Sequence, residues 1–297
     1  MSDPERAIQG AVPVDPTFVG FRDVLVPQDE SEAGLNALAY ADGLCSVFGA
    51  HLTGLMFGLV PYYPMSLATS AAPEGWIHAQ SQASEEAGLS ERRLKAIYAK
   101  LASRNELKRV DAFEQEIGRI CALRARTADL TVLGWSPGGG GDTERALFEA
   151  CLFDSGRPVL LVPAGHKARG VPQRALVAWN GSREAARALR ESMPLLKQIR
   201  LARFVAIDAS DTDFADGEDP CASVARHLAR HQIRIETKRA HTSGRDVATI
   251  LAEEAEQFGA GVVILGGYGH IRSGQRVYGG TTRGSLALAR TPIFFAN

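Results

Sequence analysis

The feature that most constrains the fold is an internal duplication, in which three apolar motifs occur twice in the same order. The paired segments are Val24–Asp29 with Leu176–Asn180, Ala128–Gly134 with Ala260–Gly266, and Arg157–Val162 with Thr291–Ala296. Three matches in register are hard to obtain by chance, so the 297 residues predict two copies of one domain. We expect the domains to cover residues 1–165 and 173–297, with a linker within Ala164–Gln173.

The apolar runs in both halves are continuous rather than alternating, which is typical of parallel strands buried on both faces. Helical patterns separate them. In one such pattern apolar residues from Val247 to Phe258 share a face, Gly259 is placed to end the helix, and Ser243 or Asp246 to cap its start. The sequence therefore predicts an α/β fold with two doubly wound parallel sheets. The first half is about 19 residues longer, an excess that we assign to a loop over Phe57–Ile77.

Composition excludes several classes of protein. Lys and Arg total 33 against 34 Asp and Glu, which argues against a broad nucleic-acid surface. The four cysteines are far apart and form no CxxC pair, so reduced thiols are expected rather than disulfides. Met1–Gly20 has no signal-peptide pattern, and the most apolar stretch, Leu52–Met65, is broken by prolines. These features predict a cytoplasmic protein without a membrane partner.

The second half contains a glycine-rich loop after its Val262–Leu265 strand. Its small residues are Gly266, Gly267, Gly269, Gly279, Gly280, Thr281 and Thr282. Glycines allow close backbone approach, and a helix beginning near Thr281 offers free N–H groups and a positive dipole end to a phosphate. The alternative is that the glycines only form a tight strand-to-helix turn. The spacing fits neither a Walker loop nor the Rossmann fingerprint.

The spacing Gly266-x2-Gly269-x9-Gly279 resembles the ATP-binding motif of the universal stress protein family. The Val177–Ser182 opening and the Gly266–His270 run also look like the tandem bacterial members of that family, and His51–Leu55 looks like the second strand of the family. The resemblance therefore covers both halves. It implies a five-stranded parallel sheet in each half, in the class called adenine nucleotide alpha hydrolase-like. It also implies ATP or another adenine nucleotide, with or without magnesium, at the carboxyl ends of the first and fourth strands.

The same resemblance implies roles for individual residues. Gly266, Gly269 and Gly279, with the residues that follow them, would contact ribose and phosphates, and Arg272 and Arg276 would add positive charge.

Near the base, Asn180 would lie beside adenine and ribose, and Val205 or Ala206 would offer backbone groups to the adenine edge. The chain departs from the family pattern at two of these positions. Gly280 stands where a hydroxyl residue is usual, which leaves Thr281 or Thr282 to supply it, and Asn180 replaces an Asp.

The first half retains an acid at Asp29 but loses the glycine spacing. Pro137 lacks an N–H, and Asp142 and Glu144 would repel a phosphate. We therefore expect nucleotide in the second half alone.

The apolar final strands, Pro158–Val162 and Pro292–Ala296, would be edges that need cover. This favours an intramolecular pseudo-dimer of the two halves. A homodimer of two chains is a further expectation.

Other residues favour structural roles. His227 and His231 have a spacing that can share a metal, but no third ligand is evident nearby. Cys151 lies in an apolar helical stretch and is expected in the core. Trp135 and Trp179 end strand segments, where packing is favoured over stacking on a ligand.

Together these patterns predict a nucleotide-binding regulatory or stress-response module and not a dedicated catalyst. Two alternatives remain. One is an enzyme on the same scaffold that slowly hydrolyses ATP or transfers a nucleotidyl group, for which no general base, metal carboxylate pair or loop lysine is visible. The other is a protein–protein module whose pocket is empty or holds another small ligand.

Overall fold

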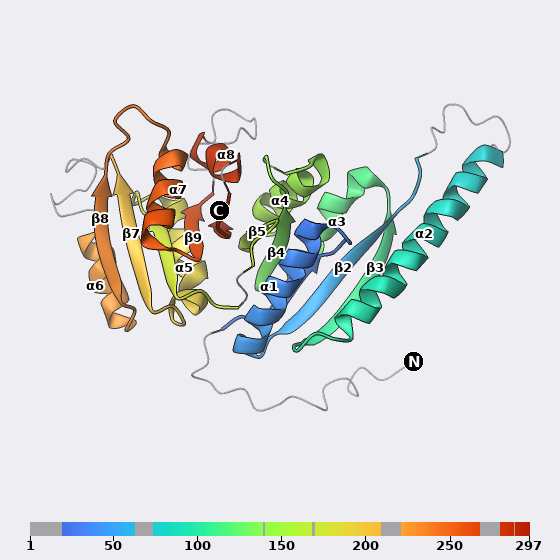
Figure 1. The fold of residues 1–297 in the computed structure, drawn as a ribbon, viewed down its shortest axis with the longest axis horizontal. Coiled ribbons are helices and arrows are strands. Elements are labelled where there is room, and N and C mark those ends of the chain that lie inside the picture. Colours follow the sequence, from blue (N-terminus) through green and yellow to red (C-terminus); the bar gives the residue numbers. More distant parts are fainter. Residues whose placement is uncertain are drawn as a thin grey trace, which may run out of the picture.

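The computed structural model describes residues 20–62, 74–138, 140–167, 170–208, 221–267, 280–287 and 289–297. Strands and helices alternate in both halves (Figure 1). The first half consists of β1 (Asp23–Pro27), α1 (Glu32–Phe48), β2 (His51–Leu59), α2 (Glu74–Tyr98), β3 (Arg104–Ala112), the 3-10 turn η3 (Glu114–Glu116), α3 (Ile117–Ala125), β4 (Leu130–Trp135), α4 (Asp142–Asp154) and β5 (Val159–Pro163). The second half consists of β6 (Arg174–Ala178), α5 (Arg183–Leu196), β7 (Leu201–Ile207), α6 (Ala222–Arg230), β8 (Ile235–Ala240), α7 (Val247–Phe258), β9 (Val262–Gly266), α8 (Gly280–Ala287) and β10 (Ile293–Ala296).

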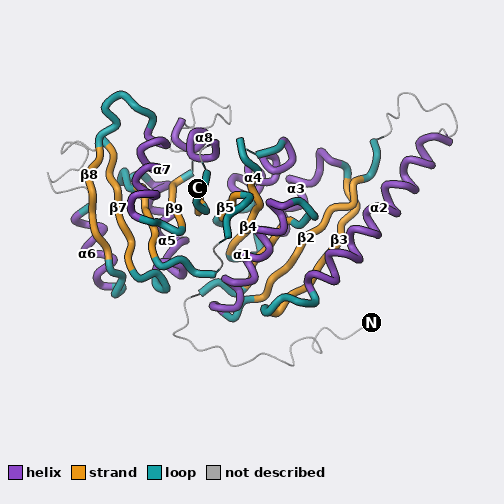
Figure 2. The backbone as a smooth tube through the Cα atoms, viewed as in Figure 1, coloured by secondary structure: helices purple, strands orange, loops and turns teal. Residues whose placement is uncertain are grey.

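The strands form one ten-stranded sheet in the order β3-β2-β1-β4-β5-β10-β9-β6-β7-β8. Within each half all the strand pairs are parallel, and the two halves have the same order (Figure 2). The predicted fold, two doubly wound five-stranded units in tandem, is confirmed.

The halves join where β5 pairs with β10. This pair is antiparallel, with Leu161 opposite Ile293, Leu160 opposite Phe294, and Val159 opposite Phe295. Each of these side chains is at most 4% exposed. The expectation that the two terminal edges cover each other is therefore confirmed.

Helices cover both faces of the sheet, and each face has a core that runs through both halves. On one face α1, α2, α5 and α6 contribute to a core that includes Val132 and Phe294. On the other, α3, α4, α7 and α8 contribute to a core that includes Leu133 and Phe295. Successive residues of a strand point to opposite faces, so a buried strand needs apolar residues at every position.

The helix ends follow local sequence signals. Ser31 caps α1 by accepting from the Gly34 amide at 3.0 Å, and Ser182 caps α5 in the same way. The predicted helix is α7, whose cap is Asp246, and Gly259 ends it with a φ of 66°. That left-handed conformation favours glycine.

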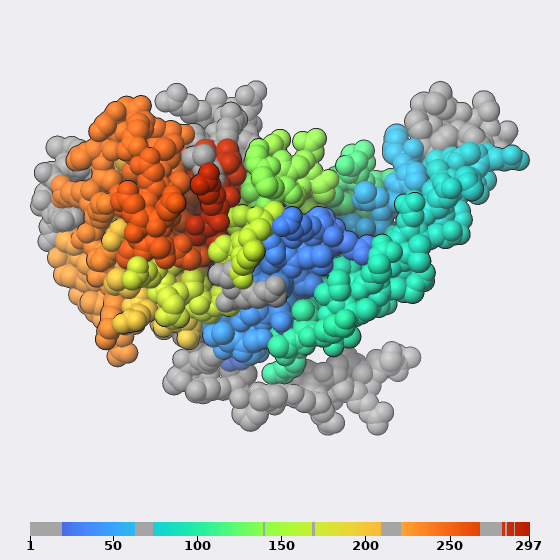
Figure 3. All heavy atoms as spheres, in the orientation of Figure 1, coloured from blue at the N-terminus to red at the C-terminus, as the bar shows by residue number. Residues whose placement is uncertain are grey.

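The extra length of the first half is mainly helix, which corrects the predicted loop. Phe57–Leu59 completes β2 and Glu74–Ile77 begins α2, while residues 63–73 lie outside the described parts of the chain. α2 has 25 residues against 9 in α6. It runs past the end of the sheet (Figures 1 and 3), and of its residues only Leu94 and Tyr98 are buried.

No described helix combines the length and the apolar character needed to cross a membrane. The four cysteines are all free and buried.

Candidate functional site at the carboxyl edge of the second half

The order of the strands reverses next to β6, which lies between β9 and β7. The chain leaves β6 toward β7 and β8, and then returns to the other side to form β9 and β10. Ligands of open α/β sheets bind beyond the carboxyl ends of the strands at such a switch point. The equivalent position in the first half lies between β1 and β4.

Asn180 follows β6 at this edge and is exposed. Its Oδ1 accepts a hydrogen bond from the Ser182 amide at 3.1 Å, which shapes the turn into α5. Asp29 occupies the equivalent place and accepts from both the amide and the hydroxyl of Ser31. The structure therefore places Asn180 where it was predicted and also gives it a structural role as a turn former.

Gly266 is required by packing. A Cβ atom there would lie 2.6 Å from the backbone of Glu184 and Ala185, at the start of α5. Gly134 is equally close to the start of α1, because a Cβ atom at that position would lie 2.4 Å from the backbone of Ala33. Because both halves show this contact, the glycine serves strand-to-helix packing whether or not a ligand is bound.

Gly267 lies between the halves. Its amide donates to the Ala296 carbonyl at 2.8 Å, and a Cβ atom there would lie 3.0 Å from Leu152 of α4.

Val205 does not offer its carbonyl to a ligand. That oxygen accepts from the Trp179 amide at 2.9 Å as part of the β6–β7 ladder, and the side chain is 1% exposed. A buried strand interior leaves its backbone groups already paired. Of the backbone groups of Val205 or Ala206 that were expected at the adenine edge, the Val205 carbonyl is therefore already used within the sheet.

Gly280 begins α8, and Thr281 and Thr282 follow in its first turn. Thr282 is 4% exposed, whereas Thr281 is half-buried. Of the two predicted hydroxyls, that of Thr281 is the more accessible. Gly269, Arg272 and Gly279 lie outside the described residues.

In the first half the carboxylate of Glu144 occupies the loop before α4, where a phosphate would otherwise bind. Glu144 accepts from the amides of Ser136 and Gly141, both at 3.0 Å, and from the Ser136 hydroxyl at 2.6 Å. This arrangement satisfies free N–H groups at the start of α4.

From the sequence, Asp142 and Glu144 were both expected to repel a phosphate. The structure gives the two residues different roles. Asp142 is fully exposed and lies 3.7 Å from Arg145. The sequence feature that indicates the capping role of Glu144 is its position three residues after the cap residue Gly141.

The two loops differ in charge. Residues 266–283 contain no Asp or Glu and include three arginines, Arg272, Arg276 and Arg283. The corresponding residues 134–149 contain three acids, Asp142, Glu144 and Glu149, and one arginine, Arg145. Only the loop of the second half has the charge balance that an anionic ligand requires.

Trp135 connects the two halves. Its indole Nε1 donates to the Leu286 carbonyl of α8 at 3.0 Å, and its ring packs 5.8 Å from that of Phe148. The side chain is 1% exposed, so the packing role predicted for Trp135 is confirmed.

The remaining candidates occupy structural positions. His227 and His231 lie on α6 and beyond its end, with ring centroids 4.8 Å apart. Within the described ranges no group of three or more metal-ligating side chains occurs. Cys151 is fully buried, as predicted, with its Sγ 3.4 Å from that of Cys121.

No protein-family model and no curated protein matches the chain. Solved structures with the same fold do exist. A universal stress protein from Archaeoglobus fulgidus DSM 4304 is 16% identical, with a TM-score of 0.66 over 93% of this chain and 96% of that one. A candidate universal stress protein from Pseudomonas aeruginosa UCBPP-PA14 is 14% identical, with a TM-score of 0.57 over 93% of both chains. A functionally unknown protein from Pseudomonas aeruginosa PAO1 is 16% identical, with a TM-score of 0.54 over 93% and 92%. The chain has the tandem fold of these proteins.

Proposed function

We propose that this protein is a regulatory or stress-response module that binds an adenine nucleotide, ATP in the first instance, at the carboxyl edge of its second half. The observation that carries the proposal is the difference between two equivalent loops. In the first half the Glu144 carboxylate already takes the amides of Ser136 and Gly141. In the second half, residues 266–283 supply no carboxylate that could do the same.

A phosphate at the start of α8 would be favoured for two reasons. The first N–H groups of a helix have no partner within it, and the helix dipole is positive at that end. The exposed Asn180 lies across the switch point, where a nucleoside would extend from the phosphates. The magnesium ion that accompanies ATP would be carried in by the nucleotide.

Calorimetric titration with ATP and magnesium tests the site with a matched pair of variants. Thr281→Glu places a carboxylate in the first turn of α8 and should weaken binding about tenfold or more. Thr143→Glu makes the same change in the first turn of α4 and should leave binding unchanged. We expect one nucleotide per chain. Two per chain, or equal losses in both variants, would contradict the assignment to the second half.

A second pair of variants tests the glycine spacing. Gly279→Val should abolish binding because a β-branched residue blocks close backbone approach, and Gly139→Val should have no effect. If the unmutated protein binds no adenine nucleotide, the proposal fails and the protein–protein module is favoured.

We propose further that the protein is not a dedicated catalyst. The loop over residues 266–282 contains no Asp, Glu or Lys, so it lacks the usual general base and metal ligands of phosphoryl transfer. Phosphate release should therefore fall far below about 1 per second. A steady-state rate in the range of ordinary enzymes would instead favour the enzyme alternative.

A further inference from the structure

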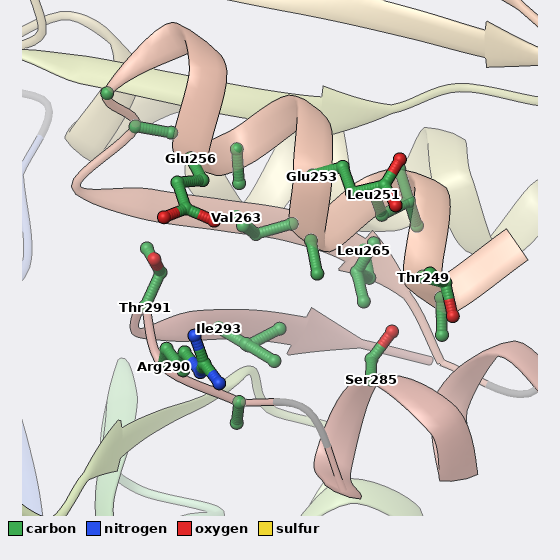
Figure 4. Close-up of a pocket in the computed structure, with 16 residues that line it drawn as sticks. Thr249, Leu251, Glu253, Glu256, Val263, Leu265, Ser285, Arg290, Thr291 and Ile293 are labelled. Carbon is green, nitrogen blue, oxygen red and sulfur yellow. The ribbon is translucent and has the colours of Figure 1, made fainter.

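A cavity lies on the sheet face that α7 covers. It has a volume of about 320 Å³ and lies between α7, β9 and β10 (Figure 4). Its lining is mainly small or aliphatic, and includes Leu251, Ala255, Val263, Leu265 and Ile293. We call it the α7 groove.

The groove is open because α8 is short. α8 has eight residues against 13 in α4. It packs closely on the start of α7, where a Cβ atom at Gly284 would lie 2.6 Å from that of Ala248. In the first half the longer α4 covers α3, and Cys121 and Cys151 meet there at 3.4 Å. The α7–α8 pair thus borders a cavity, whereas at the equivalent α3–α4 pair these two thiols are in contact.

A polar cavity of about 460 Å³ adjoins the groove at the junction of the halves. The two cavities share Ala289 and Arg290 in their linings. The polar cavity also includes Lys167 and His166, and its described lining contains no acidic residue. Lys167 and Arg290 are exposed and form no ion pair within the part of the chain that the structure describes.

His166 adds an unsatisfied polar atom beside these cations. Its Nε2 is buried without a hydrogen-bond partner among the described residues. Burial lowers the pKa of this imidazole, so it is neutral near pH 7. Within the lining of the junction cavity, an anionic group near Arg290 and Lys167 would therefore meet two positive charges and no negative one.

We propose that the α7 groove and the junction cavity form one binding site for a medium-chain carboxylate, with the hydrocarbon chain in the groove and the carboxylate at Arg290 and Lys167. The site is separate from the proposed nucleotide site and does not depend on it. Each methylene buried in such a groove increases affinity about fourfold. The positive charges of Arg290 and Lys167 at the other end of the site then favour an anionic head group, because the charges are complementary.

Two acidic residues on α7 bear on the orientation of the ligand, that is, on where its charged head group lies. Glu253 is already paired with Arg245, at 2.8 and 2.9 Å. Glu256 lines the groove on the side opposite Arg290 and Ile293 (Figure 4). A carboxylate is repelled from Glu256 and attracted to the junction, whereas an alkylammonium ion would do the reverse. The charge of the head group is thus the property to test.

The experiment is calorimetric titration of the full chain with decanoate, below the concentration at which it forms micelles. Decanol, decylamine and hexanoate are the comparison ligands. We expect decanoate to bind more tightly than all three. Equal binding of decanol or decylamine, or no binding of decanoate, would overturn the proposal.

Variants then test the two parts of the site. Arg290→Ala and Lys167→Ala change exposed side chains and should each weaken decanoate about tenfold. Arg119→Ala, an exposed arginine on α3, is the matched control and should have no effect. Ala252→Phe on α7 should fill the groove and weaken decanoate binding, with the far-UV circular dichroism spectrum of the same variant as the check on folding. Unchanged decanoate affinity in both Arg290→Ala and Ala252→Phe would refute the site.

Discussion

Replacing Trp135 by Phe tests how strongly the two halves hold each other. The indole Nε1 of Trp135 donates to the Leu286 carbonyl, 3.0 Å away and on the other half. α8 ends at Ala287, so the Leu286 carbonyl belongs to the last turn, where no helix partner exists. Phe retains an aromatic ring beside Phe148 but cannot donate to this oxygen.

The expected loss of stability has two parts. Leaving a buried carbonyl without its donor costs about 1–3 kcal/mol. The smaller ring leaves space in a site that is 1% exposed, which adds about 1 kcal/mol. We therefore expect Trp135→Phe to lower the free energy of unfolding by about 2–4 kcal/mol.

The assay is urea unfolding followed by far-UV circular dichroism. Trp76→Phe is the matched control, because Trp76 also donates through Nε1, to the Pro61 carbonyl at 3.2 Å, but is only half-buried near the start of α2. Its loss should stay below about 1 kcal/mol. A Trp135→Phe loss no larger than that of the control would refute the view that this bond stabilises the junction.

Three other features of the structure can be tested by stability and labelling measurements. Hydrogen bonds from Arg93, and secondarily from Ser90, lower the pKa of Glu30 from its ordinary 4.5 to about 2, so their contribution to stability is present above pH 4.5 and is lost as the pH falls toward 2. Arg93→Ala should remove most of that pH dependence, as measured by unfolding at pH 6, 4 and 2. Gly134→Ala and Gly266→Ala should each destabilise by more than about 2 kcal/mol, because the added carbon meets backbone in both cases; equal stability in thermal unfolding would contradict this. The four buried thiols should react with a thiol reagent at pH 8 only after denaturation, since burial raises the pKa of Cys45, for example, to about 12; rapid labelling of the native protein would show that the cores open readily.

The sequence by itself determined the duplicated α/β fold. Continuous apolar runs such as Val262–Leu265 require burial on both faces, and this requirement already indicates parallel strands between helices. Helix ends were equally readable, as at Gly259, because capping depends on a few adjacent residues. The position of Asn180 at the carboxyl edge followed from its place after a strand. These features are local, so sequence spacing is enough to specify them.

Only the tertiary structure decided which groups meet across long separations. Glu144 was expected to repel a ligand, but folding brings it onto the Ser136 amide, where it satisfies the loop from within. Val205 or Ala206 was expected to offer backbone groups to adenine, but the Val205 carbonyl belongs to the strand ladder with Trp179. The presence of the α7 groove beside Arg290 follows from α8 being shorter than α4, its equivalent in the first half. Such outcomes depend on packing between segments far apart in the chain, which no local pattern of residues encodes.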